Sequence, residues 1–264
     1  MSLASFPFWR VVPGEREGAY ILHVMPPATV GPDGAPHVMG GVALGAAIDA
    51  MELASEQPVL WANIQFLSPT QHAEELSITC EQCGGGQSVG QWMAHITVNG
   101  RPTHRVSAAL GAREPSERQV FAKMPDVPGP DECEPRVDER YGAIGSLYDQ
   151  VEHRNARIDH DAGYQAIWTR NKSGFANDAG WLAVVSDFFL GAHPKSQGGS
   201  SLDATFRFIE ASQPGWVLSV TQLGAFDRGV AHGSAQHFGE DGQLLAISSQ
   251  TGVLPRIARA DLMG

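Results

Sequence analysis

The sequence predicts an α+β protein built from two similar units in tandem, each an antiparallel sheet curled around one apolar helix. The order of elements predicts this architecture, because an apolar helix followed by four strand-like runs occurs twice along the chain. The spacing agrees: Gly100 and Gly242 each close a turn and lie 142 residues apart, as do Phe66 and Phe208. A charged, proline-rich stretch separates the two copies. We therefore expect three segments: an N-terminal unit at 1–112, a linker at 113–144 and a C-terminal unit at 145–264.

In the first copy, Gly18–Met25 alternates like a strand and precedes an apolar run of helical length at Gly40–Ala54. Small and apolar residues surround this run on nearly all sides, which predicts a buried helix. Four runs with the period of a strand follow: Val59–Leu67, Glu75–Cys83, Ser88–Val98 and Thr103–Gly111. The dipeptide Asn99-Gly100 between the last two is a strong hairpin signal.

The second copy repeats this order. Gly163–Thr169 is predicted as a strand, and Asp178–His193 as an apolar helix with Asp178 as its N-cap. Four further strand-like runs complete the copy: Ser201–Ile209, Trp216–Phe226, Val230–Phe238 and Gln243–Val253. The dipeptide Asp241-Gly242 takes the place of the first hairpin turn.

The composition indicates a packed, acidic protein and argues against several classes of partner. Of 264 residues, 42% are hydrophobic, and the formal net charge is −11. Nucleic-acid and anionic membrane partners require a basic face, so we expect neither. The N-terminal stretch resembles no signal peptide, and no apolar run reaches the roughly 18 residues of a membrane span. Three cysteines give no disulfide framework, so we expect a reduced, cytoplasmic protein.

One polar residue lies on a face that otherwise points inward. In the last strand-like run, alternation places Gln250 on the same face as Leu244 and Ala246, which are typical core residues. A buried amide has up to four hydrogen-bonding sites, and leaving them unpaired costs about 1–3 kcal/mol. The position therefore predicts a functional role for this glutamine.

Four short motifs occur in order on the predicted elements: Gly40-Gly41 at the start of the first helix, Ser186-Asp187 in the second helix, Ser201-Leu202-Asp203 at the start of the next strand, and Gln250-Thr251-Gly252 followed by Arg256 at the end of the last. Together with the repeated helix-in-sheet pattern, they give a chain that resembles the double hot-dog acyl-CoA thioesterases of the thioesterase II (TesB-like) family. The resemblance covers nearly the whole chain.

The resemblance implies an acyl-CoA thioesterase of lipid metabolism, with a water-activating set at Asp187, Ser201 and Gln250. In this interpretation Asp187 is the general base, and the other two residues orient the attacking water. Backbone N–H groups at a helix start, near Gly40 and Gly41, stabilise the oxyanion. The substrate is an acyl-CoA, and the chemistry requires no covalent intermediate, metal or cofactor.

The chain departs from the family's pattern at two positions. Serine stands at position 201, where threonine is commoner, and this keeps the hydroxyl group. Ala204 stands where a histidine usually follows Asp203. This second departure bears on the pocket and on the range of substrates.

The repeat offers a test of the proposed site that needs no family. Subtracting 142 from each proposed residue gives apolar or small counterparts in the first copy: Gly45, Val59 and Ala108. Constraints of the fold act on both copies alike, so a polar surplus in one copy needs another cause. The comparison predicts one active site per chain, carried by the C-terminal unit.

Other functions fit the same sequence. Hot-dog folds also host hydratases and dehydratases of acyl thioesters, which use an Asp/His pair, and no histidine here lies in a helix or strand motif of that type. His37, three residues before Gly40, has two interpretations: a residue that borders the pocket, or a solvated loop residue, which is the favoured one. A non-catalytic acyl-thioester binding protein is the third interpretation. Curved sheets of this type often pair edge to edge, so we expect a homodimer or a higher homo-oligomer.

Two further motifs are set aside. The segment Gly86–Gly90 fits the G-x-S-x-G nucleophile elbow, but strand alternation continues beyond it, so Ser88 follows a hairpin turn rather than preceding a helix. Cys80 and Cys83 fit C-x-x-C inside a strand, and with Cys133 as the one further thiol a four-cysteine zinc site is impossible.

Overall fold

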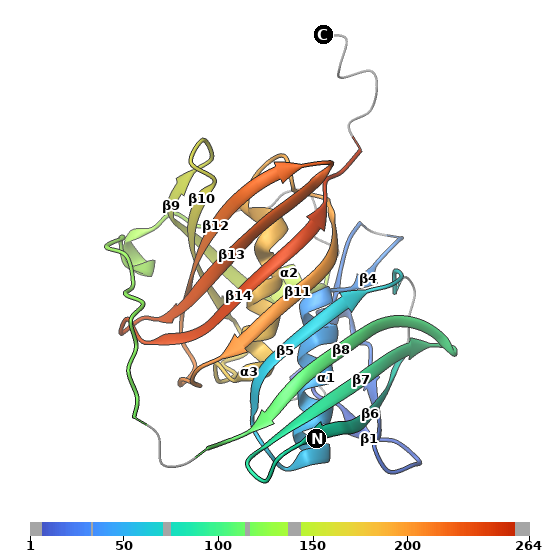
Figure 1. The fold of residues 1–264 in the computed structure, drawn as a ribbon. Coiled ribbons are helices and arrows are strands. Elements are labelled where there is room, and N and C mark those ends of the chain that lie inside the picture. The colour runs from blue at the N-terminus through green and yellow to red at the C-terminus, as the bar shows by residue number, and fades with distance from the viewer. Residues whose placement is uncertain (1–6, 33, 71–74, 114–116, 137–143, 257–264) are drawn as a thin grey trace.

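One continuous antiparallel sheet of 12 strands forms the protein (Figure 1). The computed structural model describes residues 7–32, 34–70, 75–113, 117–136 and 144–256. From edge to edge the sheet contains β1 (Val12–Pro13), β2 (Ala19–His23), β6 (Glu75–Gly85), β7 (Val89–Val98), β8 (Arg101–Gly111), β5 (Val59–Phe66), β11 (Ser200–Phe208), β14 (Leu244–Val253), β13 (Val230–Gly239), β12 (Val217–Asp227), β10 (Tyr164–Asn171) and β9 (Val151–Asp159). The two predicted copies occupy the two halves of this sheet and join where β5 pairs with β11.

Two helical segments lie against the inner face of the curved sheet (Figure 1). They are α1 (Gly40–Ser55) and α3 (Ala179–Ser186), and the 3-10 helix η4 (Asp187–Ala192) continues α3. The helices run antiparallel and in close contact, because a Cβ atom at Gly41 would lie 2.8 Å from the carbonyl oxygen of Ala183, and one at Gly45 would lie 2.9 Å from that of Gly180. Glycines on α1 therefore permit the backbone contact that joins the two units.

The strands follow the predicted repeat, with a shared register. Ala62 pairs with Ala108 in the first unit, and Ala204 pairs with Gln250 in the second. Each residue of the second pair lies 142 positions after its counterpart in the first. The sequence offset therefore reflects true structural equivalence in the central strands.

Several short elements and one full strand were not predicted. The strand is β9, whose sequence carries polar residues on both faces and so lacks the alternation of a half-buried strand. The short elements are β1, β3 (Thr29–Val30), β4 (His37–Val38), α2 (Leu147–Gln150), η2 (Pro26–Ala28) and η3 (Pro130–Glu132).

The segment before β9 packs on the outer face of the second unit. Met124 and Val127 contact a buried cluster that includes Trp168 and Phe238. The indole Nε1 of Trp168 also donates to the carbonyl oxygen of Pro128 over 2.9 Å. The division of the chain at 112 and 145 stays a prediction, and these contacts tie part of the predicted linker to the C-terminal unit.

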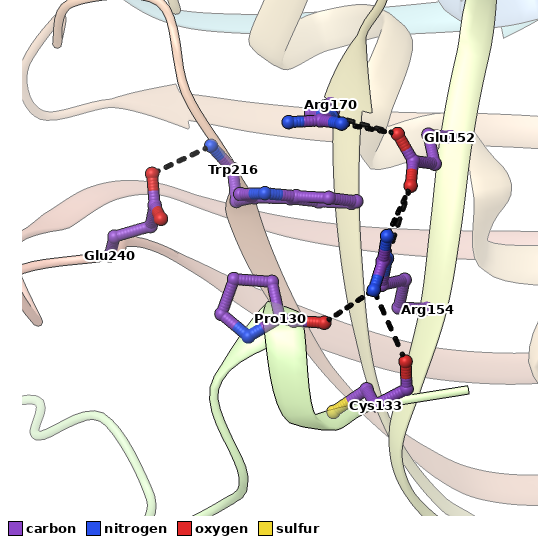
Figure 2. Close-up of polar contacts among 7 residues, drawn as sticks. All are labelled: Pro130, Cys133, Glu152, Arg154, Arg170, Trp216 and Glu240. Atoms are coloured by element: carbon purple, nitrogen blue, oxygen red, sulfur yellow. Dashed lines mark hydrogen bonds and ion pairs between the residues drawn. The ribbon is translucent and has the colours of Figure 1, made fainter. Parts of the chain in front are cut away.

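A cation–π cluster holds the segment before β9 in place near Pro130 (Figure 2). The guanidinium groups of Arg170 and Arg154 lie 4.4 Å and 5.4 Å from the centre of the Trp216 ring. Glu152 accepts hydrogen bonds from both arginines, and Arg154 donates in turn to the carbonyl oxygen of Pro130 over 3.1 Å. Every charge in the cluster is thus paired, which indicates a structural role.

Within the described residues, no helix has the length and apolar character needed to span a bilayer.

Candidate active site

The structure brings Gln250 together with two other polar side chains predicted from the sequence. Gln250 is 4% exposed and lies on the inner face of β14, between β11 and β13. Its Nε2 donates to Asp187 Oδ1 over 2.8 Å and to Ser201 Oγ over 2.7 Å. Its Oε1 is buried and has no hydrogen-bond partner within the described ranges. A buried amide with a free acceptor is costly unless a ligand uses it.

A β-bulge turns Ser201 toward the site. Ser201 pairs with Gly252 and Asp203 with Thr251, so Leu202 is an extra residue on its strand. Regular alternation from the buried Ala204 would point Leu202 inward, but the bulge leaves Leu202 44% exposed. The inward position passes to Ser201.

Asp187 lies where α3 gives way to η4, and it accepts three hydrogen bonds. Gly41 N donates to its Oδ2 over 2.7 Å, and the Gln250 amide and the Ser201 hydroxyl also donate to the carboxylate. Burial raises the pKa of Asp187 to about 6, although the three donors act in the opposite direction. Part of its surface remains open to a cavity. Asp187 is thus a carboxylate that accepts a proton near neutral pH.

The Gly40-Gly41 pair is explained by close approach to Asp187. A Cβ at Gly40 would lie 2.9 Å from Asp187 Oδ2, and a Cβ at Gly41 would lie 2.8 Å from the Cβ of Asp187. The Gly41 N–H donates its hydrogen bond to the carboxylate of Asp187. Of the two glycines, Gly40 is therefore the one whose N–H can donate to a bound ligand. The Gly40 N–H makes no hydrogen bond to the residues that the structure describes, and Gly40 lines the cavity.

The cavity has a volume of about 620 Å³ and is bounded by both units. From the N-terminal unit it receives residues of the loop before α1 together with Phe66 and His104. The C-terminal unit contributes Asp187 and Ser201, the aromatic side chains of η4, and a wall of strand residues. This wall is largely polar, and its members are His153, Gln165, Thr169, Ser219, Thr221 and His237, with Ile167 among them.

Three histidines on strands line the cavity, and none of the three was predicted from the sequence. Burial lowers the pKa of His104 and of His237 to about 4. Burial also lowers the pKa of His153 to about 3, and the positive charges of Arg136 and Lys172 act in the same direction. All three are therefore neutral at physiological pH. No motif or metal-ligand spacing marks these histidines in the sequence. A comparison of equivalent strands in the two copies is the signal that could have found them.

The histidine rings hydrogen-bond to hydroxyl groups rather than to Asp187. The Nδ1 atoms of His104, His153 and His237 lie 3.1 Å, 2.9 Å and 2.9 Å from the hydroxyls of Thr103, Thr169 and Ser219, respectively. His37 also lines the cavity, and burial lowers its pKa. Its interpretation as a solvated loop residue is therefore wrong.

The counterpart of Asp187 in the first unit is at or next to Asp49, which corrects the pairing with Gly45. Seven residues, 193–199, connect η4 to β11, whereas three residues, 56–58, connect α1 to β5. The four extra residues reduce the offset between the helices from 142 to about 138, and the N-caps Met39 and Asp178 and the C-caps Glu56 and His193 agree to within one residue, so the counterpart of Asp187 is at or next to Asp49. The counterparts of Ser201 and Gln250, Val59 and Ala108, follow the observed register. Ser201 and Gln250 are therefore the two site residues that are polar in the second unit and apolar in the first.

The motifs set aside from the sequence lie away from this site. Ser88 is exposed in the turn between β6 and β7. Cys80, Cys83 and Cys133 are free. Among the described residues, no cluster of histidine, cysteine or acidic side chains is arranged to hold a metal ion.

Comparisons with known proteins identify relatives. A family defined by the C-terminal domain of acyl-CoA thioesterases matches residues 122–254. No curated protein matches the chain in sequence. A protein from Novosphingobium aromaticivorans, described as a thioesterase, has a solved structure that is 30% identical, with 95% of this chain and 100% of that chain covered and a TM-score of 0.88.

Two more distant structures show the fold. A protein of unknown function with a hot dog fold from Alicyclobacillus acidocaldarius is 18% identical, covers 95% of this chain and 97% of its own, and has a TM-score of 0.78. The acyl-CoA thioesterase II TesB2 from Mycobacterium marinum is 17% identical, with coverages of 95% and 98% and a TM-score of 0.74. The predicted double hot-dog fold is confirmed.

Proposed function

We propose that this chain, which belongs to the acyl-CoA thioesterase family, hydrolyses an acyl-CoA to the free acid and CoA by direct attack of water. The observation that carries the proposal is the amide of Gln250, which donates to both Asp187 and Ser201 at the wall of a cavity. Proteins similar to this chain that are described as thioesterases support the same chemistry.

Asp187 acts as the general base in this mechanism. The water oxygen attacks the thioester carbonyl carbon while one water proton passes to the carboxylate. Gln250 and Ser201 hold the carboxylate of Asp187 in place by hydrogen bonds, and this fixes the position from which the base orients the water for attack. The tetrahedral intermediate then expels CoA as the C–S bond breaks, and the proton on Asp187 passes to the departing sulfur.

The two glycines at the start of α1 take different roles. The Gly41 N–H holds the carboxylate of Asp187, so Gly41 is a positioning residue. The Gly40 N–H lies at the N-terminus of the 16-residue helix α1, where the aligned peptide dipoles favour negative charge. It therefore stabilises the oxyanion as the carbonyl carbon becomes tetrahedral.

Thiol release from a panel of acyl-CoAs of increasing chain length tests the function. We expect release with at least one acyl-CoA, and a loss of about a hundredfold in kcat for Gln250→Ala, which carries the residue of the first unit at this position. A wild-type protein that releases no thiol from any member would refute the function. A Gln250→Ala variant as active as the wild type would refute the site.

Hydration or dehydration of an acyl thioester is the second candidate, because neutral histidines line the cavity. Those histidines hydrogen-bond to serine and threonine hydroxyls, whereas this chemistry requires a histidine beside the acidic group. Loss of enoyl absorbance from an enoyl-CoA without thiol release would favour this candidate. Binding of acyl-CoA with neither reaction would favour a non-catalytic binding protein.

We also propose that the protein acts in lipid metabolism, in the cytoplasm, as a homodimer or a higher homo-oligomer. Free cysteines fit a reducing compartment, and the outermost strand β1 offers a sheet edge for pairing, whereas backbone hydrogen bonds with Glu134 and Arg136 cover part of the edge of β9. Size-exclusion chromatography with light scattering measures the oligomeric state. A mass of one chain across the accessible concentration range would contradict the oligomer.

A further inference from the structure

We infer that the acyl group accepted by this site carries a hydrogen-bonding oxygen beyond the thioester carbonyl, as a hydroxyl, oxo or carboxyl substituent. The inference rests on the proposed function and names its class of substrate. It follows from the polar wall that Gln165, Thr169, Ser219, Thr221 and His237 form inside the C-terminal unit.

These side chains come from three neighbouring strands and share the inner face of the sheet. Gln165 on β10 lies opposite Thr221 on β12, and Ser219 on β12 lies opposite His237 on β13. Gln165 and Thr221 are 6% and 4% exposed, so the wall lies inside the protein rather than at its surface. The same cavity contains Asp187, so an acyl chain whose carbonyl lies at the base can reach this wall.

The fold does not require polar residues at three of these positions. Strand pairings followed outward from β5 and β11 match Ser219 with Ile78, and His237 with Ile96. The same pairings match Thr169 with Leu22. The residues of the first unit are fully buried core residues, at 0%, 0% and 1% exposure. The second unit replaces a hydrocarbon core with hydrogen-bonding groups that surround an open space.

The hydroxyl of Thr221, which lines the cavity, makes no hydrogen bond to any residue in the described part of the chain. By contrast, His237 is held between Ser219 and Ser248, at 2.9 Å from each hydroxyl, and Gln165 Oε1 accepts from Arg136 Nη1 over 3.2 Å. Thr221 therefore offers to the cavity a hydroxyl that a ligand oxygen can bind.

Apolar residues in the same cavity suit the rest of such an acyl chain. Ile167 lies between the polar positions of β10, and Phe188 and Phe189 line the cavity from η4. Methylene groups can pack on these side chains while a distal oxygen reaches Thr221. An unsubstituted alkyl chain would instead cover Thr221 and leave its hydroxyl without a hydrogen-bond partner.

Matched acyl-CoAs test the inference. We compare hexanoyl-CoA, 6-hydroxyhexanoyl-CoA and the mono-CoA ester of hexanedioic acid, and the same three forms with eight carbons. We expect kcat/KM at least about tenfold higher for an oxygenated form than for the alkyl form of equal length. An alkyl form that equals or exceeds both oxygenated forms at each length would overturn the inference, while its thiol release would leave the proposed function standing. Absence of thiol release from all six would instead overturn the proposed function.

A near-isosteric variant locates the effect. Thr221→Val removes the unpaired hydroxyl, and Thr79→Val on an exposed position of the first unit is the matched control. We expect Thr221→Val to raise KM for the preferred oxygenated substrate about fivefold or more, with kcat/KM for the alkyl form unchanged or higher. Thr79→Val is expected to change neither. Equal losses for both substrates would overturn the inference, and Ser219→Ala provides a second variant if Thr221→Val does not fold.

Discussion

Two buried aspartates occupy equivalent or adjacent positions in the two units, and their surroundings differ. Asp49 on α1 is 4% exposed, forms an ion pair with Arg10, and accepts a hydrogen bond from Val11 N over 2.8 Å. Arg10 also donates to Asp178, the N-cap of α3, over 2.7 Å. Asp187, in the second unit, has no cationic partner within the described residues and borders the cavity.

This difference shows that a buried carboxylate is not sufficient for a candidate active site, because the surroundings of the two aspartates differ. In the first unit the segment Phe8–Val11 covers the aspartate, with the fully buried Trp9 packed against Gly180, which has no Cβ to exclude the indole. In the second unit the corresponding space is the cavity, and Gln250 and Ser201 replace apolar residues. Asp49 forms an ion pair with Arg10, whereas burial without a cationic partner among the described residues raises the pKa of Asp187.

Exchange of each carboxylate for an amide gives the largest expected contrast. Asp187→Asn removes the proposed base, so kcat should fall by about 10²–10⁴-fold. Its stability should not decrease, because the variant no longer buries a charge. Asp49→Asn leaves Arg10 without its partner and should lower the free energy of unfolding by about 2 kcal/mol, below the value for a fully buried pair because Arg10 is 37% exposed.

Urea denaturation and thiol release on the same preparations measure both halves of this contrast. Asp49→Asn should retain kcat within about twofold, because it touches no residue of the site. An active Asp187→Asn variant, or an Asp49→Asn variant that is stable but inactive, would show that the assignment of the two aspartates is reversed or incomplete.

The strands were predictable from the sequence because inward and outward residues alternate, and β14, for example, was placed within one residue of its observed start. The strand β9 was not, because charged residues on both faces remove the alternation. Gln250 was predicted as an inward polar residue. The pairing of Asp187 with Gly45 was wrong, because a four-residue difference in the connection after the helix is invisible to a constant offset.

The polar wall was missed for a related reason. Its members are ordinary strand residues, and nothing in a single strand separates an inward threonine from an outward one. Only the register between strands shows that Ser219 and His237 replace Ile78 and Ile96. The β-bulge that turns Ser201 inward is likewise a property of strand pairing rather than of local sequence.

Alanine variants of two glycines on α1 distinguish an effect on the position of the base from an effect on helix packing alone. Gly41→Ala places a Cβ against the backbone of α3 and against Asp187, whereas Gly45→Ala places one against Gly180 and Trp9, which lie outside the site. Both should lose about 2 kcal/mol of stability from overpacking. Gly41→Ala should also lose about a hundredfold in kcat, because a shift of the base of about 1 Å spoils the attack geometry.

Thermal unfolding and kcat, measured in parallel, distinguish the two glycine variants. Gly45→Ala should keep most of its activity at a temperature well below its Tm. A Gly41→Ala variant with the same Tm as Gly45→Ala and the same kcat would show that the Gly41 N–H does not position Asp187.

The pH dependence of the reaction gives a smaller and more specific effect. With the pKa of Asp187 raised to about 6, kcat/KM should fall about tenfold for each pH unit below 6 and level off above 7. The folded state holds this proton more tightly than the unfolded state, whose carboxyl has a pKa of about 3.9. The resulting stabilisation is therefore complete below about pH 4 and disappears as the pH rises through about 6.

A pH–rate profile of the wild type, with unfolding followed at pH 4 to 7, measures both consequences. Asp187→Asn should lose this component of the pH dependence of stability, while Asp49→Asn should keep it. A profile flat between pH 5 and 7 would contradict the role of Asp187 as the base.

The smallest expected effect concerns Ser201, where threonine is commoner among the thioesterases that the sequence resembles. The first unit supplies the argument, because Val59 occupies the equivalent bulged position, is β-branched and is 1% exposed. The backbone therefore accepts a β-branched residue there, and Ser201→Thr, which keeps the hydroxyl, should change kcat by no more than about twofold. Ser201→Val has the same shape as threonine without the hydroxyl, so it should lose about tenfold in kcat as the hydrogen bond from Gln250 disappears. Equal activity of the threonine and valine variants would show that the hydroxyl plays no part, and that Gln250 and Asp187 hold the water without it.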